Sequence, residues 1–395
     1  MGVSIGEVIA RADAATDGLG HAASTRMQYR WAWSRFERFC GEQGVAVFSD
    51  AAADAFVDFV TGEFGAGRFK QWKYKLLRKA VLVLSEVAAT GSYRWSVARA
   101  AGVDDRLDPA VRPVQERFVS WLAGLNLAAA TVDLYATVSR TVLGWLPGYG
   151  VVDVRKLTAS DISAVVVFLS GSYRPGSMRS ALSALRVWCR FIEQDGGLSG
   201  LSFAVPATRV SRVRPVAVIT AAEAEKLVAT ADPATPVGLR DRAILLLAAR
   251  TGLRPSDITG LRFGDIDWRA AKITVSQYKT GEPIVLPLLA DVGDAIAAYL
   301  LSGRPGDARS DRVFVRAKAP HVPLIAKDLH YVTSRAFTRS GVKAHGGPGR
   351  GMRVLRASLA TRMLQAETPL PIVSGALGHR GTGSVRHYLS ADEWH

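Results

Sequence analysis

Tyr388 lies nine residues after His379, and several cationic residues precede both of them in the sequence. Arg254 lies in "RTGLRPSDITGLR", Lys279 in "YKTGE" and Arg356 in "GMRVLRASLATRML". Guanidinium, ammonium and imidazole groups can together bind an anion such as a phosphate, and a phenol can attack it as a nucleophile. The sequence therefore raises the question of whether distant parts of the chain assemble a cationic pocket around Tyr388.

Each of these residues, taken alone, has an ordinary structural explanation. Arg254 could cap a helix or pair with a nearby carboxylate, and Lys279 could be a solvated lysine of a hairpin. His379 could end a helix, and Arg356 could contact a phosphate without a catalytic role. Tyr388 could pack in an amphipathic segment. The order and spacing of the five residues are needed to decide between these explanations and a shared site.

In that order and spacing the sequence resembles the tyrosine recombinase (phage integrase) family. The resemblance covers about residues 112–393, and five ordered boxes keep the family's intervals. His379 lies twenty-three residues beyond Arg356, as in the family's "LGH" box, and Tyr388 lies nine further on. The matching positions are, in chain order, Arg254, Asp257, Lys279, Arg353, Arg356, Ala360, Thr361, His379 and Tyr388.

The resemblance implies phosphoryl transfer on DNA through a covalent 3'-phosphotyrosine, without a metal, a cofactor or ATP. Arg254 and Arg356 would stabilise the negative charge of the transition state, because guanidinium groups match phosphate oxygens. His379 would donate a further hydrogen bond to the same phosphate. Lys279 would protonate the leaving deoxyribose oxygen, and Tyr388 would be the nucleophile. Asp257 would support the site.

Arg353 departs from the family pattern, which usually has histidine at this position. Arginine has no acceptor nitrogen and stays protonated in proteins, so Arg353 cannot take the proton of Tyr388. It could still add charge stabilisation to the site. His345 and His387 are alternative proton acceptors, although neither occupies a box position.

The composition favours a nucleic-acid partner. The chain has 395 residues and a net charge of +15, and the cationic excess is spread over several segments. A generally basic proteome would explain the same excess. The two cysteines, Cys40 and Cys189, lie far apart and show no metal-ligand spacing, which argues against disulfides and zinc. We expect neither a signal peptide nor a membrane span, and therefore a cytoplasmic protein without cofactors.

Two N-terminal segments resemble each other at a constant offset of 106 residues. They are "TRMQYRWAWSRFERFCGEQG" at 25–44 and "TVDLYATVSRTVLGWLPGYG" at 131–150. Each reads as an amphipathic helix that ends at glycine, and each is followed by an apolar helix and a basic helix. The pattern predicts two similar helical units, although generic helical similarity would look much the same. The matched pairs are Thr25 and Thr131, Tyr29 and Tyr135, Phe36 and Val142, Phe39 and Trp145, and Gly44 and Gly150.

From about residue 220 the pattern becomes mixed, with helical periodicity around two alternating segments, "KITVSQ" and "PIVLPL". These predict a β-hairpin with Lys279 at its tip. The expected fold is multidomain, with two all-α helical DNA-binding units followed by a mixed α+β tyrosine-recombinase catalytic domain. The predicted divisions are an N-terminal helical domain at 1–105, a core-binding helical domain at 110–205, a basic linker at 206–218 and a catalytic domain at 219–395.

The expected partners are double-stranded DNA with specific recombination sites, further copies of the chain, and accessory or sister recombinases. By resemblance, a tetramer would exchange strands through a Holliday junction during integration, excision or transposition of a mobile element. The alternatives are a type IB topoisomerase-like enzyme and a catalytically weak architectural DNA-binding relative. The expected DNA contacts, taken from the basic helices and the linker, are Lys70, Lys73, Lys75, Arg78, Arg179, Arg186, Arg190, Arg209, Arg212 and Arg214.

Overall fold

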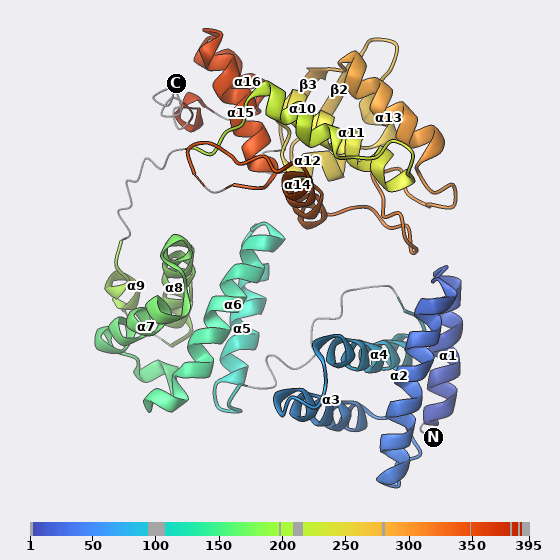
Figure 1. The fold of residues 1–395 in the computed structure, drawn as a ribbon. Helices are drawn as coiled ribbons and strands as arrows, with labels where there is room; N and C mark the ends of the chain where they lie inside the picture. The colour runs from blue at the N-terminus through green and yellow to red at the C-terminus, as the bar shows by residue number, and fades with distance from the viewer. Residues whose placement is uncertain are drawn as a thin grey trace. The chain divides into compact units, whose positions relative to one another are not determined.

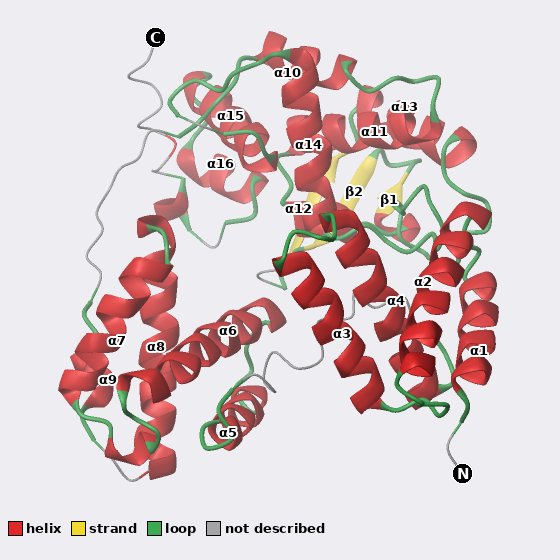
Figure 2. Ribbon diagram, turned by 60° about the horizontal axis from the view of Figure 1, so that its bottom comes forward, coloured by secondary structure: helices red, strands yellow, loops and turns green. Residues whose placement is uncertain are grey.

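The structure, a computed structural model, describes residues 3–93, 107–196, 199–207, 216–278, 281–347, 349–379, 381–385 and 388. The chain divides into two compact units, of which one is Ser96–Ser211 and the other combines Met1–Trp95 with Arg212–His395. Helices dominate both units (Figures 1 and 2). Among the described residues, no helix is both long enough and apolar enough to cross a bilayer.

The N-terminal part consists of helices packed around a core of aromatic and aliphatic side chains. Trp33 and Phe36 are fully buried in this core, and the Trp33 indole donates a hydrogen bond to the carbonyl of Ala80 at 2.9 Å. The first helix was not predicted from the sequence; it begins where the Ser4 side chain accepts a hydrogen bond from the Glu7 amide. The helices are α1 (Ile5–Gly18), α2 (Ala23–Glu42), α3 (Asp50–Gly65) and α4 (Gln71–Thr90).

The second unit repeats this order of helices around its own core, in which Phe118, Leu143 and Trp188 are fully buried. In the sequence comparison, α6 corresponds to α2 and α8 corresponds to α4. The described helices are α5 (Arg112–Ala123), α6 (Ala129–Trp145), α7 (Ala159–Ser172), α8 (Pro175–Gly196) and α9 (Leu201–Ala204). The domain boundaries drawn from the sequence stay a prediction.

The C-terminal part, residues 216–388, surrounds one small sheet with helices. The strands β1 (Ile266–Asp267), β2 (Lys272–Ser276) and β3 (Pro283–Pro287) pair antiparallel in that order (Figure 2). The predicted hairpin is therefore present, whereas β1 is too short to show an alternating pattern. The described helices are α10 (Ala221–Ala229), α11 (Pro236–Thr251), α12 (Pro255–Gly260), α13 (Ala290–Ser302), α14 (Ala326–Ser340), α15 (Met352–Gln365) and α16 (Leu370–Ala376).

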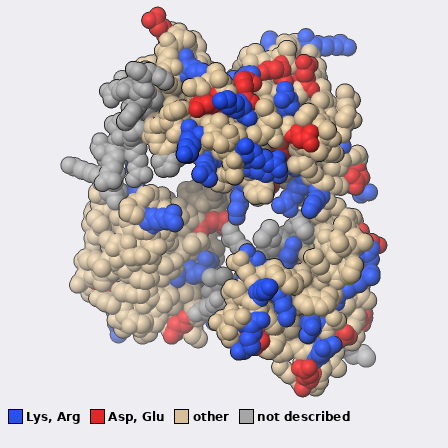
Figure 3. Space-filling view, in the orientation of Figure 1, with Lys and Arg blue, Asp and Glu red and all other residues tan. Residues whose placement is uncertain are grey.

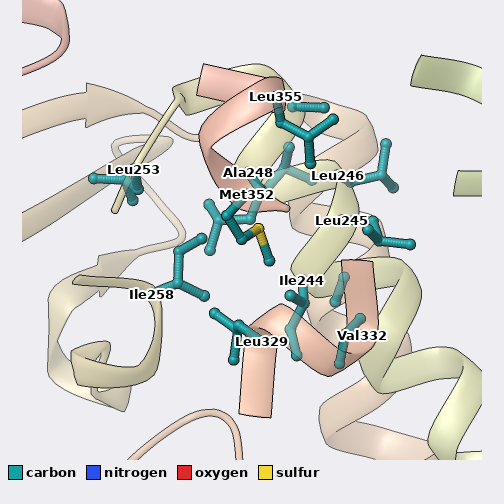
Figure 4. Packing of buried hydrophobic residues seen from close by; sticks show 14 of the residues in the cluster. Ile244, Leu245, Leu246, Ala248, Leu253, Ile258, Leu329, Val332, Met352 and Leu355 are labelled. Atoms are coloured by element: carbon teal, nitrogen blue, oxygen red, sulfur yellow. The ribbon is translucent and has the colours of Figure 1, made fainter. Parts of the chain in front are cut away.

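Helix α11 is the centre of the C-terminal core. Most of its residues from Ala243 to Ala249 are fully buried, because α13, α14 and α15 all pack against it. Figure 4 shows Met352 and Leu355 of α15 beside Ala248 of α11. This packing holds α15 against α11. Arg356, the residue after Leu355, therefore lies close to Gly252 at the end of α11.

Candidate active site

Arg254 is held where the chain passes from α11 to α12. Gly252 ends α11 in the left-handed region, with φ of 62°, and Arg254 occupies the N-cap position before Pro255. The Arg254 side chain is about one-fifth exposed, and its Nη2 donates a hydrogen bond to the carbonyl of Gly378 at 3.2 Å. The guanidinium therefore faces the loop after α16, far away in sequence.

Asp257 lies between Arg254 and the β2–β3 hairpin. Its carboxylate is buried, with Oδ2 at 3.8 Å from Nη1 of Arg254, and Oδ1 accepts a hydrogen bond from the Tyr278 amide at 3.0 Å. One carboxylate thus faces both the first arginine and the residue that precedes Lys279. Lys279 itself lies outside the described residues.

Arg356 is the most buried cation of the site, with 8% of its surface exposed. Nη1 donates to the Gly252 carbonyl at 2.6 Å, and Nη2 donates to the Leu377 carbonyl at 2.7 Å. Burial lowers the pKa of the guanidinium, and the neighbouring charge of Arg254 lowers it further, whereas interaction with Tyr388 raises it. Two like charges have therefore been brought together where an anion would stabilise both.

His379 and Tyr388 complete the group. Nη2 of Arg356 lies 2.7 Å from Nε2 of His379. A guanidinium can only donate, so Nε2 is the acceptor in this contact. The rings of His379 and Tyr388 are nearly parallel, with centroids 6.4 Å apart. Tyr388 also packs on the small apolar cluster that includes Val373 and Leu377, so it is both a packed side chain and a member of the site of its own chain.

Two glycines make this arrangement possible. A Cβ at Gly252 would lie 2.8 Å from the Leu377 side chain, so a larger residue does not fit there. The carbonyl of Gly252 accepts the hydrogen bond from Arg356. Gly378 has φ of 62°, and a Cβ there would lie 1.5 Å from the side-chain amide of Gln277. Gln277 is buried at the end of the hairpin strand. Gly378 therefore allows the loop before His379 to approach the hairpin closely, a role that the sequence alone did not reveal.

Arg353 lies in the first turn of α15, one turn before Arg356, and is exposed. Among the residues that the structure describes, no carboxylate pairs with it. Of the alternative proton acceptors, His345 lies beside Glu223, with Nε2 at 3.1 Å from Oε2, and its backbone pairs with Val218. His387 lies outside the described residues.

The expected DNA contacts differ in their surroundings. Lys73 lies over the Phe69 ring at 3.7 Å, Arg78 contacts the Tyr74 hydroxyl at 3.5 Å, and Arg186 donates to the carbonyls of Val205 at 3.0 Å and Pro206 at 3.1 Å. The exposed members are Lys70, Lys75, Arg179 and Arg190, and those outside the described residues are Arg209, Arg212 and Arg214.

Cationic side chains also gather on one face of the C-terminal part, where acidic side chains are present as well (Figure 3). Figure 3 shows Lys and Arg side chains gathered around α14 on the visible face of residues 216–388. The described part of the chain holds no cluster of three histidine, cysteine or acidic side chains that would suit a metal ion. The guanidinium groups of Arg254 and Arg356 are donors that suit an anion.

The chain is similar to known integrases and recombinases. The model described as "Phage integrase family" matches residues 217–395. The Sinorhizobium fredii protein y4gC, described as an integrase/recombinase, is 43% identical over 164 residues, which cover 41% of this chain and 82% of that protein. A second protein of that organism with the same description, y4rA, is 32% identical over 270 residues, which cover 67% of this chain and 64% of that protein, just under two thirds of its length.

A solved structure of a lambda integrase tetramer bound to a Holliday junction shares the fold. Its TM-score is 0.55 at 18% identity, over 81% of this chain and 87% of that chain. The identity and coverage of the first relative, together with the family match to the C-terminal part, establish membership. The chain belongs to the phage integrase family of tyrosine recombinases.

Proposed function

We propose that this chain cleaves DNA strands at specific sites and rejoins them through a covalent 3'-phosphotyrosine at Tyr388. The observation that carries the proposal is that four separate segments bring Arg254, His379 and Tyr388 together around the buried Arg356. Family membership and the net charge of +15 support the same conclusion.

In this reaction the Tyr388 oxygen attacks the phosphorus and gives its phenolic proton to solvent water, while the bond from phosphorus to the 5' oxygen breaks. Arg254 and Arg356 stabilise the added charge on the non-bridging oxygens. Lys279 protonates the leaving 5' oxygen. Attack of a 5' hydroxyl on the phosphotyrosine reverses the sequence and rejoins a strand, so the bond energy is conserved and no ATP is consumed.

Nη2 of Arg356 donates to His379, so an incoming phosphate oxygen would replace that imidazole nitrogen as the acceptor. His379 could then turn a proton toward the phosphate. Arg353 cannot accept the proton of Tyr388, and its exposed guanidinium, one turn before Arg356 on α15, adds a further positive charge to this end of the helix.

The assembled enzyme acts as several copies of the chain on duplex DNA. Support comes from the lambda integrase structure, in which a tetramer is bound to a Holliday junction. The helical units 1–105 and 110–205 contact the DNA flanking the cleaved bond, and the C-terminal part cuts it. The biological event is the movement of a mobile element.

A nicked suicide substrate tests the proposal. The DNA ends of the element that carries the gene supply the candidate site, and the nick lets the leaving fragment diffuse away. An SDS-resistant protein–DNA adduct is expected with the natural chain and not with Tyr388→Phe. Binding without an adduct on the true site would instead favour an architectural DNA-binding protein, the alternative that Arg353 raises.

A further inference from the structure

Helix α2 of the N-terminal part has cationic residues on two sides, and acidic residues of α1 pair with those on only one side. On the side of α1, Arg30 pairs with Asp13 at 2.6 Å, and Arg26 pairs with Asp13 and Asp17. The hydrogen bond from Arg30 lowers the pKa of Asp13, as expected for a carboxylate that stays charged. The positive charge on this side of α2 is therefore already balanced by α1.

The opposite side of α2 carries charge without such balance. Met27, Trp31, Arg35 and Arg38 recur at helical spacing along it, and neither arginine has a carboxylate partner among the described residues. Glu37, the acidic residue between them in sequence, points instead toward Gly6 of α1. The other acidic residue of this stripe is Glu42, one turn beyond Arg38 at the end of α2, and no ion pair joins it to either arginine in the described part of the chain. This side of α2 is thus cationic up to Arg38.

Helix α4 extends the same surface with a second tryptophan. The rings of Trp31 and Trp72 are 6.5 Å apart, and the guanidinium of Arg35 lies 5.4 Å from the Trp31 ring centre. Trp72 remains 61% exposed and Met27 67% exposed. Lys75, one turn beyond Trp72, is exposed and has no ion pair in the described part of the chain. The surface, here called the Trp31–Trp72 face, consists of Met27, Trp31, Arg35, Arg38, Trp72 and Lys75.

The matching helix of the second unit lacks these features. At the offset of 106 residues that relates the two sequences, the positions of Met27, Trp31, Arg35 and Arg38 become Asp133, Thr137, Thr141 and Gly144. The Trp31–Trp72 face is therefore not a general property of this kind of helix. Of the two similar helical segments, only the N-terminal one, which contains α2 and α4, carries this surface.

We propose that the Trp31–Trp72 face binds the sugar–phosphate backbone of duplex DNA. Its unpaired cations suit phosphates, and its two indoles offer N–H donors and flat surfaces against deoxyribose. A second copy of the chain fits poorly, because a two-fold contact would place the same unpaired cations against each other. The inference rests on the proposed action on DNA and adds a contact surface that the cleavage chemistry does not require.

The test measures how salt weakens the binding of the full chain to a long random-sequence duplex. The logarithm of the binding constant falls as the logarithm of the salt concentration rises, and each lost phosphate contact should make this negative slope shallower by about 0.9. Arg35→Glu is expected to weaken binding and to make the slope shallower by about that amount. Trp72→Ala is expected to weaken binding with little change in the slope. The matched control is Arg11→Glu on α1, where Arg11 is exposed and paired with Glu7 at 2.5 Å. It should leave the slope unchanged.

Thermal unfolding of each variant checks that the fold is retained. If Arg35→Glu and Trp72→Ala bind DNA as the natural chain does, the proposal is overturned. Loss of self-association with unchanged DNA binding would also overturn it, in favour of a second copy on this face. Adduct formation at Tyr388 on the suicide substrate is a separate readout, so a failure of the cleavage proposal would be recognised independently.

Discussion

Nη2 of Arg356 lies 2.7 Å from Nε2 of His379, and the same guanidinium holds the carbonyls of Gly252 and Leu377. Arg356 therefore joins the end of α11, the loop after α16 and the imidazole beside Tyr388. Its burial would be costly without these acceptors, since an unpartnered buried charge destabilises a fold. The same side chain that builds the pocket also supplies its central positive charge.

Arg356→Lys should remove most of the cleavage activity. A single ammonium group cannot reach both carbonyls and His379 at once, and it cannot bind a phosphate through two parallel hydrogen bonds. We expect the adduct to form about 100- to 1,000-fold more slowly, the range found when one donor to a transition-state oxyanion is lost. The exposed Arg269→Lys serves as a control. A fully active Arg356→Lys would contradict the clamp.

Asp257→Ala should impair protonation of the leaving group, because the Asp257 carboxylate holds the Tyr278 amide next to Lys279. A DNA substrate with sulfur in place of the leaving 5' oxygen distinguishes this effect, since a thiolate leaves without being protonated. The sulfur substrate should restore much of the activity of Asp257→Ala and Lys279→Ala but not that of Arg356→Lys. Equal restoration in all three variants would contradict these roles.

Arg353→Ala should slow adduct formation, because it removes an exposed positive charge one turn before Arg356 on α15. Arg353→His should retain more activity than the alanine variant, since histidine can both carry charge and accept a proton. The rate of adduct formation is measured for both variants across a range of pH. Only the histidine variant should show a change of rate with pH that the natural chain lacks. If Arg353→Ala equals the natural chain, Arg353 has no part in the reaction.

Gly378→Ala should reduce both stability and cleavage. Its left-handed φ costs about 1 kcal/mol for alanine, and the new Cβ would collide with the Gln277 side chain. Gln277→Ala in the same chain removes the collision but not the backbone strain. The double variant should therefore recover part of the unfolding free energy lost by Gly378→Ala. Purely additive losses would show that the two residues do not collide.

The sequence was sufficient to predict the hairpin and most helices, since each has a local pattern. The preserved intervals marked the box residues, of which the structure brings Arg254, Arg356, His379 and Tyr388 together, and their catalytic roles stay a prediction. It could not show that Arg356 is anchored by backbone carbonyls, because every residue has a carbonyl and none is marked in sequence. Gln277 and Gly378 were missed for a related reason: their contact joins segments about a hundred residues apart. The pairing of Trp31 with Trp72 likewise depends on how α2 and α4 cross.

The most direct measurement of the central claim is the mass and position of the protein–DNA adduct on a nicked substrate in the presence of a metal chelator. The natural chain should carry a 3'-linked DNA fragment on Tyr388, and Tyr388→Phe should carry none while still binding the same DNA. An adduct on another residue, an adduct that persists in Tyr388→Phe, or no adduct on the true site would contradict the account.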